Sequence, residues 1–445
     1  MNGAPPVAAG DRPRAHTVSA AYVLRCSGCG AEYEDDGYRL ECDADHGPAL
    51  LVTRYAAGRF EPDPRGEGVF RYASWLPCRG PAASSGGTVS YRSTALSRAT
   101  GIDQLWISFN GYWPERGATL ATCTFKELEA SVVLSRLPED DGAVLVIASA
   151  GNTAAAFARI CSQARRRCLI VVPDYALPVL RFDAPLAEEV KVVAIASPGD
   201  YADAIALADR IAALDGFVAE GGVRNVGRRD GLGTNLLSAT EAIGRMPDHY
   251  VQAVGSGAGA IAAHEAAGRL LADGRYGDAP PRLLLCQNAP FAPLHDSWRA
   301  GGRAVAEYDD DEARERSAEL LAPVLSNRRP PYATSGGVFD ALTGSRGDVA
   351  VAGNDAARAA QALFADAEGV DIEPAAGVAL ACLLDAVRAG RIDRGAVVSL
   401  NVTGGGRRHL EATSDLVQAA PALELGYAEL GRDDAPARAA ELLAA

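Results

Sequence analysis

Two kinds of hydrophobic pattern alternate along most of the chain. Short runs dominated by apolar residues predict buried strands at residues 105–109, 143–147, 168–172, 190–196, 250–254, 283–286 and 397–402. Apolar residues at helical spacing predict helices at residues 125–137, 153–165, 201–214, 260–271, 355–365 and 376–389. Strands that alternate with helices in this way are typical of βαβ units, so we expect an α/β fold with parallel sheets.

The composition narrows the class of protein. Hydrophobic residues make up 48% of the 445 positions and charged residues 22%, which is typical of a globular protein. The net charge of −14 argues against nucleic-acid binding, which needs a basic face. No apolar stretch is long enough to span a bilayer, and the start of the chain lacks a signal-peptide pattern. Nine scattered cysteines without a disulfide-scaffold pattern favour the reducing cytoplasm.

Lysine is almost absent from the chain. Of the 43 basic side chains, 41 are arginine, and the two lysines are Lys126 and Lys191. Arginine stays protonated, whereas a lysine amine can lose its proton and form a Schiff base. Lys126 falls in the first turn of the helix predicted at 125–137. We therefore expect Lys126 to be a covalent catalytic amine, with a chance surface lysine as the alternative.

Two glycine-rich loops join a predicted strand to a predicted helix. Backbone N–H groups at a helix N-terminus can bind an anion, and glycine leaves them accessible. The first loop suits a carboxylate and the second a single phosphate, although either could be only a tight turn. They are Ser149-Ala150-Gly151-Asn152-Thr153 and Gly255-Ser256-Gly257-Ala258-Gly259. An amine, a phosphate cradle and a carboxylate cradle are what a pyridoxal-phosphate enzyme acting on an amino acid needs.

The second loop also allows a different class of enzyme. With Ala260 it matches the dinucleotide fingerprint G-x-G-x-x-A, which predicts an NAD(P)-dependent oxidoreductase. Against that function, Asp273-Gly274-Arg275 stands about 20 residues onward, where an acidic residue ending a second strand is expected.

Four motifs in order resemble the fold-type II pyridoxal-phosphate family. They are Thr124-Phe125-Lys126, residues 149–153, residues 255–259 and Thr403-Gly404-Gly405-Gly406. The resemblance implies a tryptophan synthase β-like fold with two three-layer α/β/α domains, and a homodimer. It implies that Lys126 holds the cofactor, that Asn152 bonds its 3′-oxygen, that residues 255–259 hold its phosphate, and that Thr403 lies by the pyridine nitrogen. The substrate carboxylate would bind Ser149, Ala150, Gly151 and Thr153.

Within that family, the residues around the lysine resemble the cysteate synthases. Phe125-Lys126-Glu127-Leu128-Glu129-Ala130 and the upstream residues 111–118 carry this resemblance, whereas threonine and cysteine synthases usually have Asp-Arg after the lysine. It implies that O-phospho-L-serine and sulfite, both small anions, give L-cysteate and phosphate through an aminoacrylate. The alternatives are a threonine synthase-like enzyme that acts on phosphohomoserine, and a pyridoxal-phosphate β-replacement that uses a different nucleophile. Arg116 is a candidate to bind the anionic groups, with a solvated surface arginine as the alternative.

The amino-terminal part contains a candidate zinc site. Cys26-x2-Cys29 can form half of a tetrahedral site, and Cys42-x3-His46 can complete it. The alternative is a small β-unit with reduced cysteines and no metal. Acidic residues between the two halves argue against a DNA-reading finger.

These patterns divide the chain into five parts. We expect a flexible tail at 1–17, a small zinc-ribbon-like segment at 18–60, and a terminal helix or tail at 433–445. Between them lie a large cofactor-binding domain made of 61–125 and 250–432 and a small α/β domain at 126–249.

Overall fold

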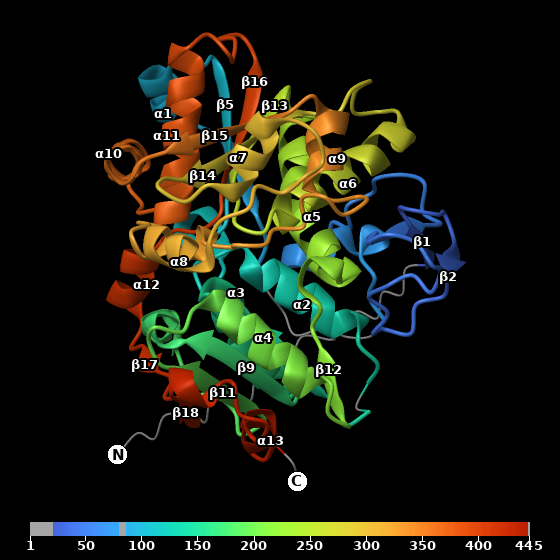
Figure 1. Ribbon diagram of the computed structural model, residues 1–445. Helices are drawn as coiled ribbons and strands as arrows, with labels where there is room; N and C mark the ends of the chain where they lie inside the picture. The colour runs from blue at the N-terminus through green and yellow to red at the C-terminus, as the bar shows by residue number, and fades with distance from the viewer. Residues whose placement is uncertain (1–20, 80–85, 140, 444–445) are drawn as a thin grey trace, which may run out of the picture.

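The computed structural model describes residues 21–79, 86–139 and 141–443 (Figure 1). The tail predicted at residues 1–17 lies outside the described residues. Two mainly parallel sheets, each covered by helices on both faces, form the body of the molecule, and a small amino-terminal β-unit packs at its side (Figure 1). The expected α/β fold with two three-layer domains is confirmed. None of the helices in the described part is long and apolar enough to cross a membrane.

The amino-terminal unit is a three-stranded antiparallel sheet in the order β2-β1-β3. Its strands are β1 Tyr22–Cys26, β2 Glu32–Tyr33 and β3 Leu51–Tyr55. A buried ion pair fastens it to the rest of the chain, because Arg136 Nη2 lies 2.7 Å from Asp35 Oδ1 and both side chains are at most 2% exposed.

The large sheet has six strands in the order β15-β14-β13-β16-β5-β4. They are β4 Val89–Arg92, β5 Gln104–Phe109, β13 His249–Ala253, β14 Arg282–Asn288, β15 Asp348–Ala352 and β16 Val397–Val402. Only β4, at the edge, runs antiparallel to its neighbour. Side chains that alternate along a strand fill two cores, so Tyr250 and Leu283 pack on one face and Val251 and Leu284 on the other.

Helices cover both faces of the large sheet. One face carries α1 Thr94–Thr100, α10 Asn354–Glu368 and α11 Pro374–Arg388. The other carries α5 Val226–Ile243, α6 Ala258–Asp273 and α9 Val338–Ser345. Ser93 caps α1 by accepting a hydrogen bond from the Leu96 amide, and Gly101, in the left-handed conformation, ends it.

The small sheet has five parallel strands in the order β12-β8-β9-β11-β18. They are β8 Val144–Ala148, β9 Cys168–Pro173, β11 Val190–Ile195, β12 Phe217–Ala219 and β18 Leu423–Leu425. One face packs against α2 Lys126–Arg136 and α3 Asn152–Ala164. The other packs against α4 Tyr201–Ala212 and α13 Ala435–Ala440.

Short elements connect these layers. The remaining helices are α7 Pro293–Ala300, α8 Asp310–Ala318 and α12 Arg407–Thr413, and the remaining strands are β6 Tyr112–Trp113, β7 Ala118–Thr119, β10 Arg181–Phe182 and β17 Val417–Gln418. The 3-10 helices in the described part are η1 Gly68–Trp75, η2 Pro114–Arg116, η3 Asp174–Val179, η4 Gly222–Arg224, η5 Pro323–Leu325 and η6 Tyr427–Glu429.

Two parts of the architecture differ from the sequence-based expectation. First, β18 falls in the range predicted for the large domain, yet it pairs with β11 and completes the small sheet. Three residues are too few to show a strand pattern, so its partner could not be predicted. Second, the 18-residue α5 was not predicted as a helix, and it packs on the large sheet although it falls in the range predicted for the small domain, 126–249. The helix is buried on nearly all sides, and its buried residues include glycines and charged side chains. It therefore lacks the apolar stripe opposite a polar face that identifies a helix in a sequence.

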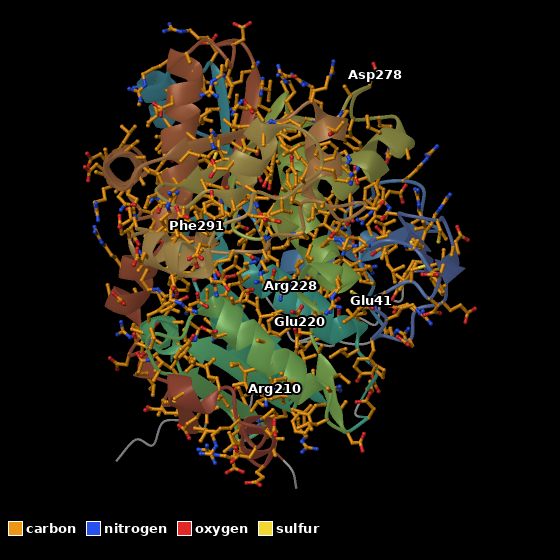
Figure 2. The ribbon with its side chains drawn as sticks, viewed as in Figure 1. Glu41, Arg210, Glu220, Arg228, Asp278 and Phe291 are labelled. Carbon is orange, nitrogen blue, oxygen red and sulfur yellow. The ribbon has the colours of Figure 1, made fainter. Side chains whose placement is uncertain are left out.

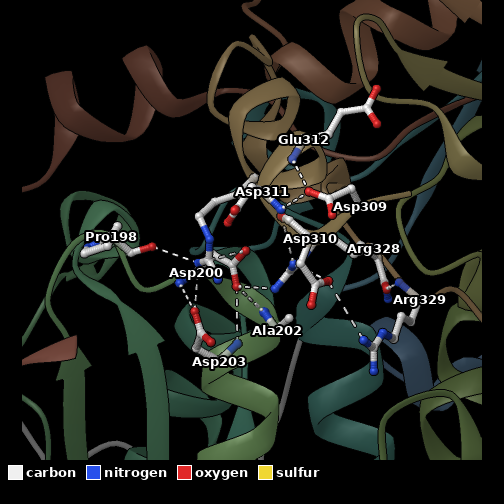
Figure 3. A network of polar contacts seen from close by, with 12 residues as sticks. Pro198, Asp200, Ala202, Asp203, Asp309, Asp310, Asp311, Glu312, Arg328 and Arg329 are labelled. Carbon is white, nitrogen blue, oxygen red and sulfur yellow. Dashed lines mark hydrogen bonds and ion pairs between the residues drawn. The ribbon is translucent and has the colours of Figure 1, made fainter. Parts of the chain in front are cut away.

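A charged network joins the two domains beside α4 (Figure 3). Asp200 caps α4, and Asp203 lies in its first turn. From the large domain, Arg314 Nη1 lies 2.9 Å from Asp203 Oδ2, and Arg328 Nη2 lies 3.2 Å from Asp200 Oδ1. The network therefore fixes the start of α4 against the large domain at the point where the two sheets meet.

Candidate active site

A cavity lies where the carboxyl ends of the two sheets face each other. Ligands bind at such ends in open α/β sheets because the loops there converge. Four separate segments that carry predicted site residues meet in its wall. The lining includes Lys126, Ser149, Ala150, Gly151, Asn152, Thr153, Gly255, Ser256, Gly257, Ala258, Gly259 and Thr403.

Lys126 is the first residue of α2 and lines this cavity. Two backbone hydrogen bonds, both 2.9 Å, hold its segment against the loop that follows β16. They run from Phe125 N to Thr403 O and from Gly405 N to Cys123 O. Burial lowers the pKa of the Lys126 amine, the nearby Glu129 carboxylate opposes that shift, and Arg228 adds to it. A lowered pKa makes the neutral, nucleophilic form of the amine more accessible.

Each glycine-rich loop leads from a parallel strand into a helix N-terminus. Ser149 Oγ accepts hydrogen bonds from Gly151 N at 3.0 Å and Ala154 N at 2.9 Å, which fixes the turn between β8 and α3. Between β13 and α6, Gly257 adopts a φ of 81°. The first turn of a helix has N–H groups without intrahelical partners and the positive end of the helix dipole. Each domain therefore presents an anion site to the cavity.

Glu373, just before α11, joins two of the predicted cofactor residues. Its Oε2 accepts a hydrogen bond from Asn152 Nδ2 at 2.9 Å, and its Oε1 accepts one from Thr403 Oγ1 at 3.0 Å. Burial raises the pKa of the Glu373 carboxyl, although both hydrogen bonds act in the opposite direction. The carboxyl group thus holds the amide and the hydroxyl on one wall of the cavity.

Two buried charged residues beside Lys126 were not assigned to the site from the sequence. Glu129 Oε2 accepts a hydrogen bond from Lys126 Nζ at 3.1 Å, and Arg228 Nη1 lies 3.0 Å from Glu129 Oε1. Tyr201 and Asn327 also line the cavity. Spacing could have indicated Glu129, which stands three residues after Lys126 on a helix. Arg228 has no local signal, because it comes from a helix about a hundred residues onward.

The set of groups in the cavity fits pyridoxal phosphate. It combines a primary amine, a helix N-terminus for a phosphate, and an amide and a hydroxyl for polar atoms of the ring. The glycines are also required by packing. A Cβ at position 255 would lie 2.9 Å from Val324 O, and one at position 259 would lie 2.2 Å from Gln252 Nε2. Positions 255 and 259 therefore stay free of side chains, which keeps the backbone there accessible to a phosphate.

Arg116 does not lie among the cavity-lining residues. Its guanidinium group stacks over the rings of Tyr91, at 4.3 Å, and Trp113, at 4.7 Å. The prediction that Arg116 binds the substrate is therefore not supported by its position. Arg116 precedes the lysine segment closely in sequence, but η2 and the β6–β7 hairpin direct its side chain to a separate aromatic cluster.

The four predicted metal ligands come together in the amino-terminal unit. One ligand atom from each of Cys26, Cys29, Cys42 and His46 lies within 4.8 Å of the others. Cys26 Sγ is 3.4 Å from His46 Nε2, and Cys29 Sγ is 3.6 Å from Cys42 Sγ. Three thiols and an imidazole at this separation match the donors and the size of a tetrahedral zinc site.

Comparisons with known proteins agree with this geometry. A family model described as "Pyridoxal-phosphate dependent enzyme" matches residues 85–404. The cysteate synthase of Methanosphaerula palustris is 47% identical over 391 residues, which are 87% of this chain and 91% of that protein. The cysteate synthase of Methanosarcina acetivorans is 43% identical over 401 residues, 90% of this chain and 95% of that protein.

Solved structures support the fold alone. Maize serine racemase has a TM-score of 0.54 at 17% identity, covering 73% of this chain and 92% of its own. A processed threonine deaminase from Solanum lycopersicum has a TM-score of 0.52 at 16% identity, covering 71% and 83%. The family match favours pyridoxal phosphate over the nicotinamide alternative. The chain is an enzyme that belongs to the pyridoxal-phosphate dependent family and, within it, to the cysteate synthases.

Proposed function

We propose that the enzyme converts O-phospho-L-serine and sulfite to L-cysteate and phosphate. The observation that carries this proposal is the Lys126 amine in a cavity between two helix N-termini, in a chain 47% identical to a cysteate synthase. A substrate with a carboxylate and a phosphate needs two anion sites in addition to the cofactor phosphate site. The turn at residues 149–153 is one candidate, since its N–H groups can donate hydrogen bonds to a carboxylate.

In the proposed reaction, the residues of the cavity have separate roles. Lys126 binds the cofactor, residues 255–259 hold its phosphate, and Asn152 and Thr403 contact polar atoms of its ring. Pyridoxal phosphate, when bound, withdraws electrons from the substrate and makes the proton at Cα acidic. The Lys126 amine takes that proton and later returns it to Cα, while residues 149–153 hold the carboxylate so that the C–H bond faces the amine.

Product analysis tests the reaction directly. The purified enzyme with bound cofactor should form cysteate and phosphate from O-phosphoserine only when sulfite is present. Phosphohomoserine should give no threonine. Formation of threonine, or equal phosphate release without sulfite, would contradict the proposed substrate pair.

Absorbance of the purified enzyme tests the role of Lys126. We expect a visible band near about 410–420 nm, typical of the cofactor joined to a lysine. Lys126→Ala should lose this band, and Lys191→Ala, on β11 outside the cavity, should keep it. A band that persists unchanged in Lys126→Ala would exclude Lys126 as the attachment site.

We also propose that Cys26, Cys29, Cys42 and His46 bind one structural zinc ion. The support is the close set of three thiols and one imidazole. Metal analysis of the purified protein should find about one zinc per chain. Cys29→Ser with Cys42→Ser should lose it, whereas Cys161→Ala, in the core of the small domain, should retain it. Wild-type protein without stoichiometric zinc, purified with zinc in the medium, would contradict this proposal.

We also propose that the enzyme is a homodimer and that it works in the reducing cytoplasm. Family resemblance supports the dimer. All nine cysteines lie in the described part of the chain and are free thiols, which suits a reducing compartment. Light scattering of the purified enzyme should give twice the chain mass, and a mass equal to one chain would contradict the dimer.

A further inference from the structure

Among the residues that the structure describes, the Lys126 amine has one carboxylate partner, Glu129, and other residues hold that carboxylate in place. Glu129 Oε2 lies 3.1 Å from Lys126 Nζ, and the Glu129 side chain has no exposed surface. The other oxygen, Oε1, accepts a hydrogen bond from Thr153 Oγ1 at 2.9 Å and lies 3.0 Å from Arg228 Nη1. One oxygen is therefore fixed by the protein, which leaves the second directed at the amine.

Arg228 is itself fixed by a second carboxylate. Its Nε donates to Glu220 Oε1 at 2.9 Å, and its Nη2 contacts Glu220 Oε2. Figure 2 shows Arg228 and Glu220 side by side between the two domains. Glu220 in turn accepts from Gly222 N at 3.0 Å, and its own amide pairs with Val146 O of β8 at 3.0 Å. A chain of charge-assisted hydrogen bonds thus runs from the edge of the small sheet to Lys126.

The neighbouring carboxylate on the same helix does not share this arrangement. Glu127 is also buried, at 2% exposure, but it accepts a hydrogen bond from the Thr122 amide and lies 3.9 Å from Arg159 Nε. Two glutamates of similar burial therefore flank Lys126, and only Glu129 faces its amine.

We propose that Glu129 is a positioning residue for Lys126, which holds the amine in place and neutralises its ammonium form whenever the amine is not bonded to the cofactor. This rests on the proposed role of Lys126. When the substrate Cα–H bond breaks, the proton forms a new N–H bond on Nζ, and the electron pair stays with the substrate and cofactor. The amine becomes an ammonium ion on a side chain that is only 18% exposed, where an unpaired charge is costly. Glu129 offsets that cost at a fixed distance, while Arg228 and Thr153 keep Glu129 from turning away.

Other charged or titratable groups also surround the amine. They are Arg228 of α5, Glu220 after β12, Tyr201 of α4 and Glu373 before α11. Arg228 and Glu220 pair with each other, and Glu373 is engaged by Asn152 and Thr403. Glu129 is thus the carboxylate in hydrogen-bond contact with Nζ.

The two-lysine composition makes a direct test practical. Protein labelled with 13C at lysine Cε should show two lysine signals, and Lys191→Arg assigns them. In cofactor-free protein, Glu129→Gln should lower the pKa of the Lys126 amine by about one to three pH units, the usual effect of an adjacent opposite charge. Glu127→Gln, the matched control, should change it much less. The Lys191 signal should titrate identically in all variants.

Two further measurements distinguish a local effect on Lys126 from a general loss of structure. Glu129→Asp keeps the charge but has a shorter reach, so its shift should lie between those of wild type and Glu129→Gln; it also serves if Glu129→Gln does not fold. In the enzyme with bound cofactor, the lower-pH limb of the pH–rate profile should move in the same direction as the amine.

The outcome is decided in the cofactor-free protein. Equal Lys126 titration in the wild type, Glu129→Asp and any folded Glu129→Gln would overturn the proposal. A shift caused equally by Glu127→Gln would overturn it too. Failure of the proposed function appears elsewhere, as a wild-type enzyme that forms no cysteate or no visible cofactor band.

Discussion

Replacing Gly257 by alanine should destabilise the protein through two separate effects. Gly257 has a φ of 81°, a left-handed conformation that costs alanine about 1–2 kcal/mol. The added Cβ would also lie 2.3 Å from Val338 Cγ2. Val338 is fully buried and β-branched, so it has little freedom to move aside, and overpacking of this kind costs about 1–3 kcal/mol. Together we expect a loss of about 2–5 kcal/mol in the free energy of unfolding.

Urea unfolding of cofactor-free protein measures this loss without a contribution from cofactor binding. Gly268→Ala is the matched control, because position 268 lies in α6, the helix that Gly257 precedes, is exposed, and its added Cβ meets no atom within 4 Å. That control should stabilise the protein by about 0.5–1 kcal/mol. Val338→Ala in the Gly257→Ala background removes the clash but not the cost of the backbone conformation. The two substitutions should therefore show a coupling energy of about 1–3 kcal/mol.

A Gly257→Ala protein as stable as the wild type would refute the packing of this loop against α9. A large loss without coupling to Val338 would assign the whole effect to the backbone conformation. Cofactor affinity of the variant should fall as well, because the N–H groups that we propose to bind the cofactor phosphate belong to the same loop.

Three further substitutions probe other parts of the structure. Arg136→Ala should cost about 3–5 kcal/mol by leaving Asp35 buried and unpaired. Burial raises the pKa of Asp35, but Arg136 outweighs burial and holds that pKa below its ordinary value. The wild type should therefore lose stability as the pH falls below about 4. In urea titrations, the stability of the variant should depend less steeply on pH over this range. Burial raises the pKa of Glu373, so its ionisation destabilises the folded state as the pH rises above about 4.3. In urea titrations of cofactor-free protein from about pH 5 to pH 8, the Glu373→Gln variant should therefore gain stability relative to the wild type. Phe157→Ala, at a fully buried position in α3, should cost about 3–5 kcal/mol in the same assay, and a loss below about 1 kcal/mol would contradict the packing of α3 on the small sheet.

Much of the fold could be predicted because buried parallel strands have a simple pattern. The strand predicted at 397–402 matches β16, and the helix that begins at Lys126 was expected within one residue. Continuous aliphatic runs are dictated by burial on both faces of a sheet, and they can be recognised without knowledge of the partners.

The undetected parts depend on partners that lie far away in sequence. In α5, Arg229 and Asp230 are buried, and they are satisfied by Glu265 and Arg269 of α6. A helix of this kind lacks a polar face, so its pattern does not distinguish it from a loop. Arg228 of α5 and Glu129 of α2 also lie far apart in sequence, so their pairing could not be predicted from a local pattern. Arg116 precedes Lys126 closely in sequence but does not line the cavity, because nearness in sequence does not determine where a long side chain ends.

The position of β18 has a consequence for how the chain is made. The first four strands of the small sheet are complete at Ala219, yet the strand that pairs with the outer edge of β11 comes about 200 residues later. At about 5–20 residues per second, the ribosome needs roughly 10–40 s to supply it. During that time β11 presents unpaired N–H and C=O groups, which can pair with another chain. Correct synthesis of this enzyme therefore depends on keeping one strand edge protected until β18 has been made.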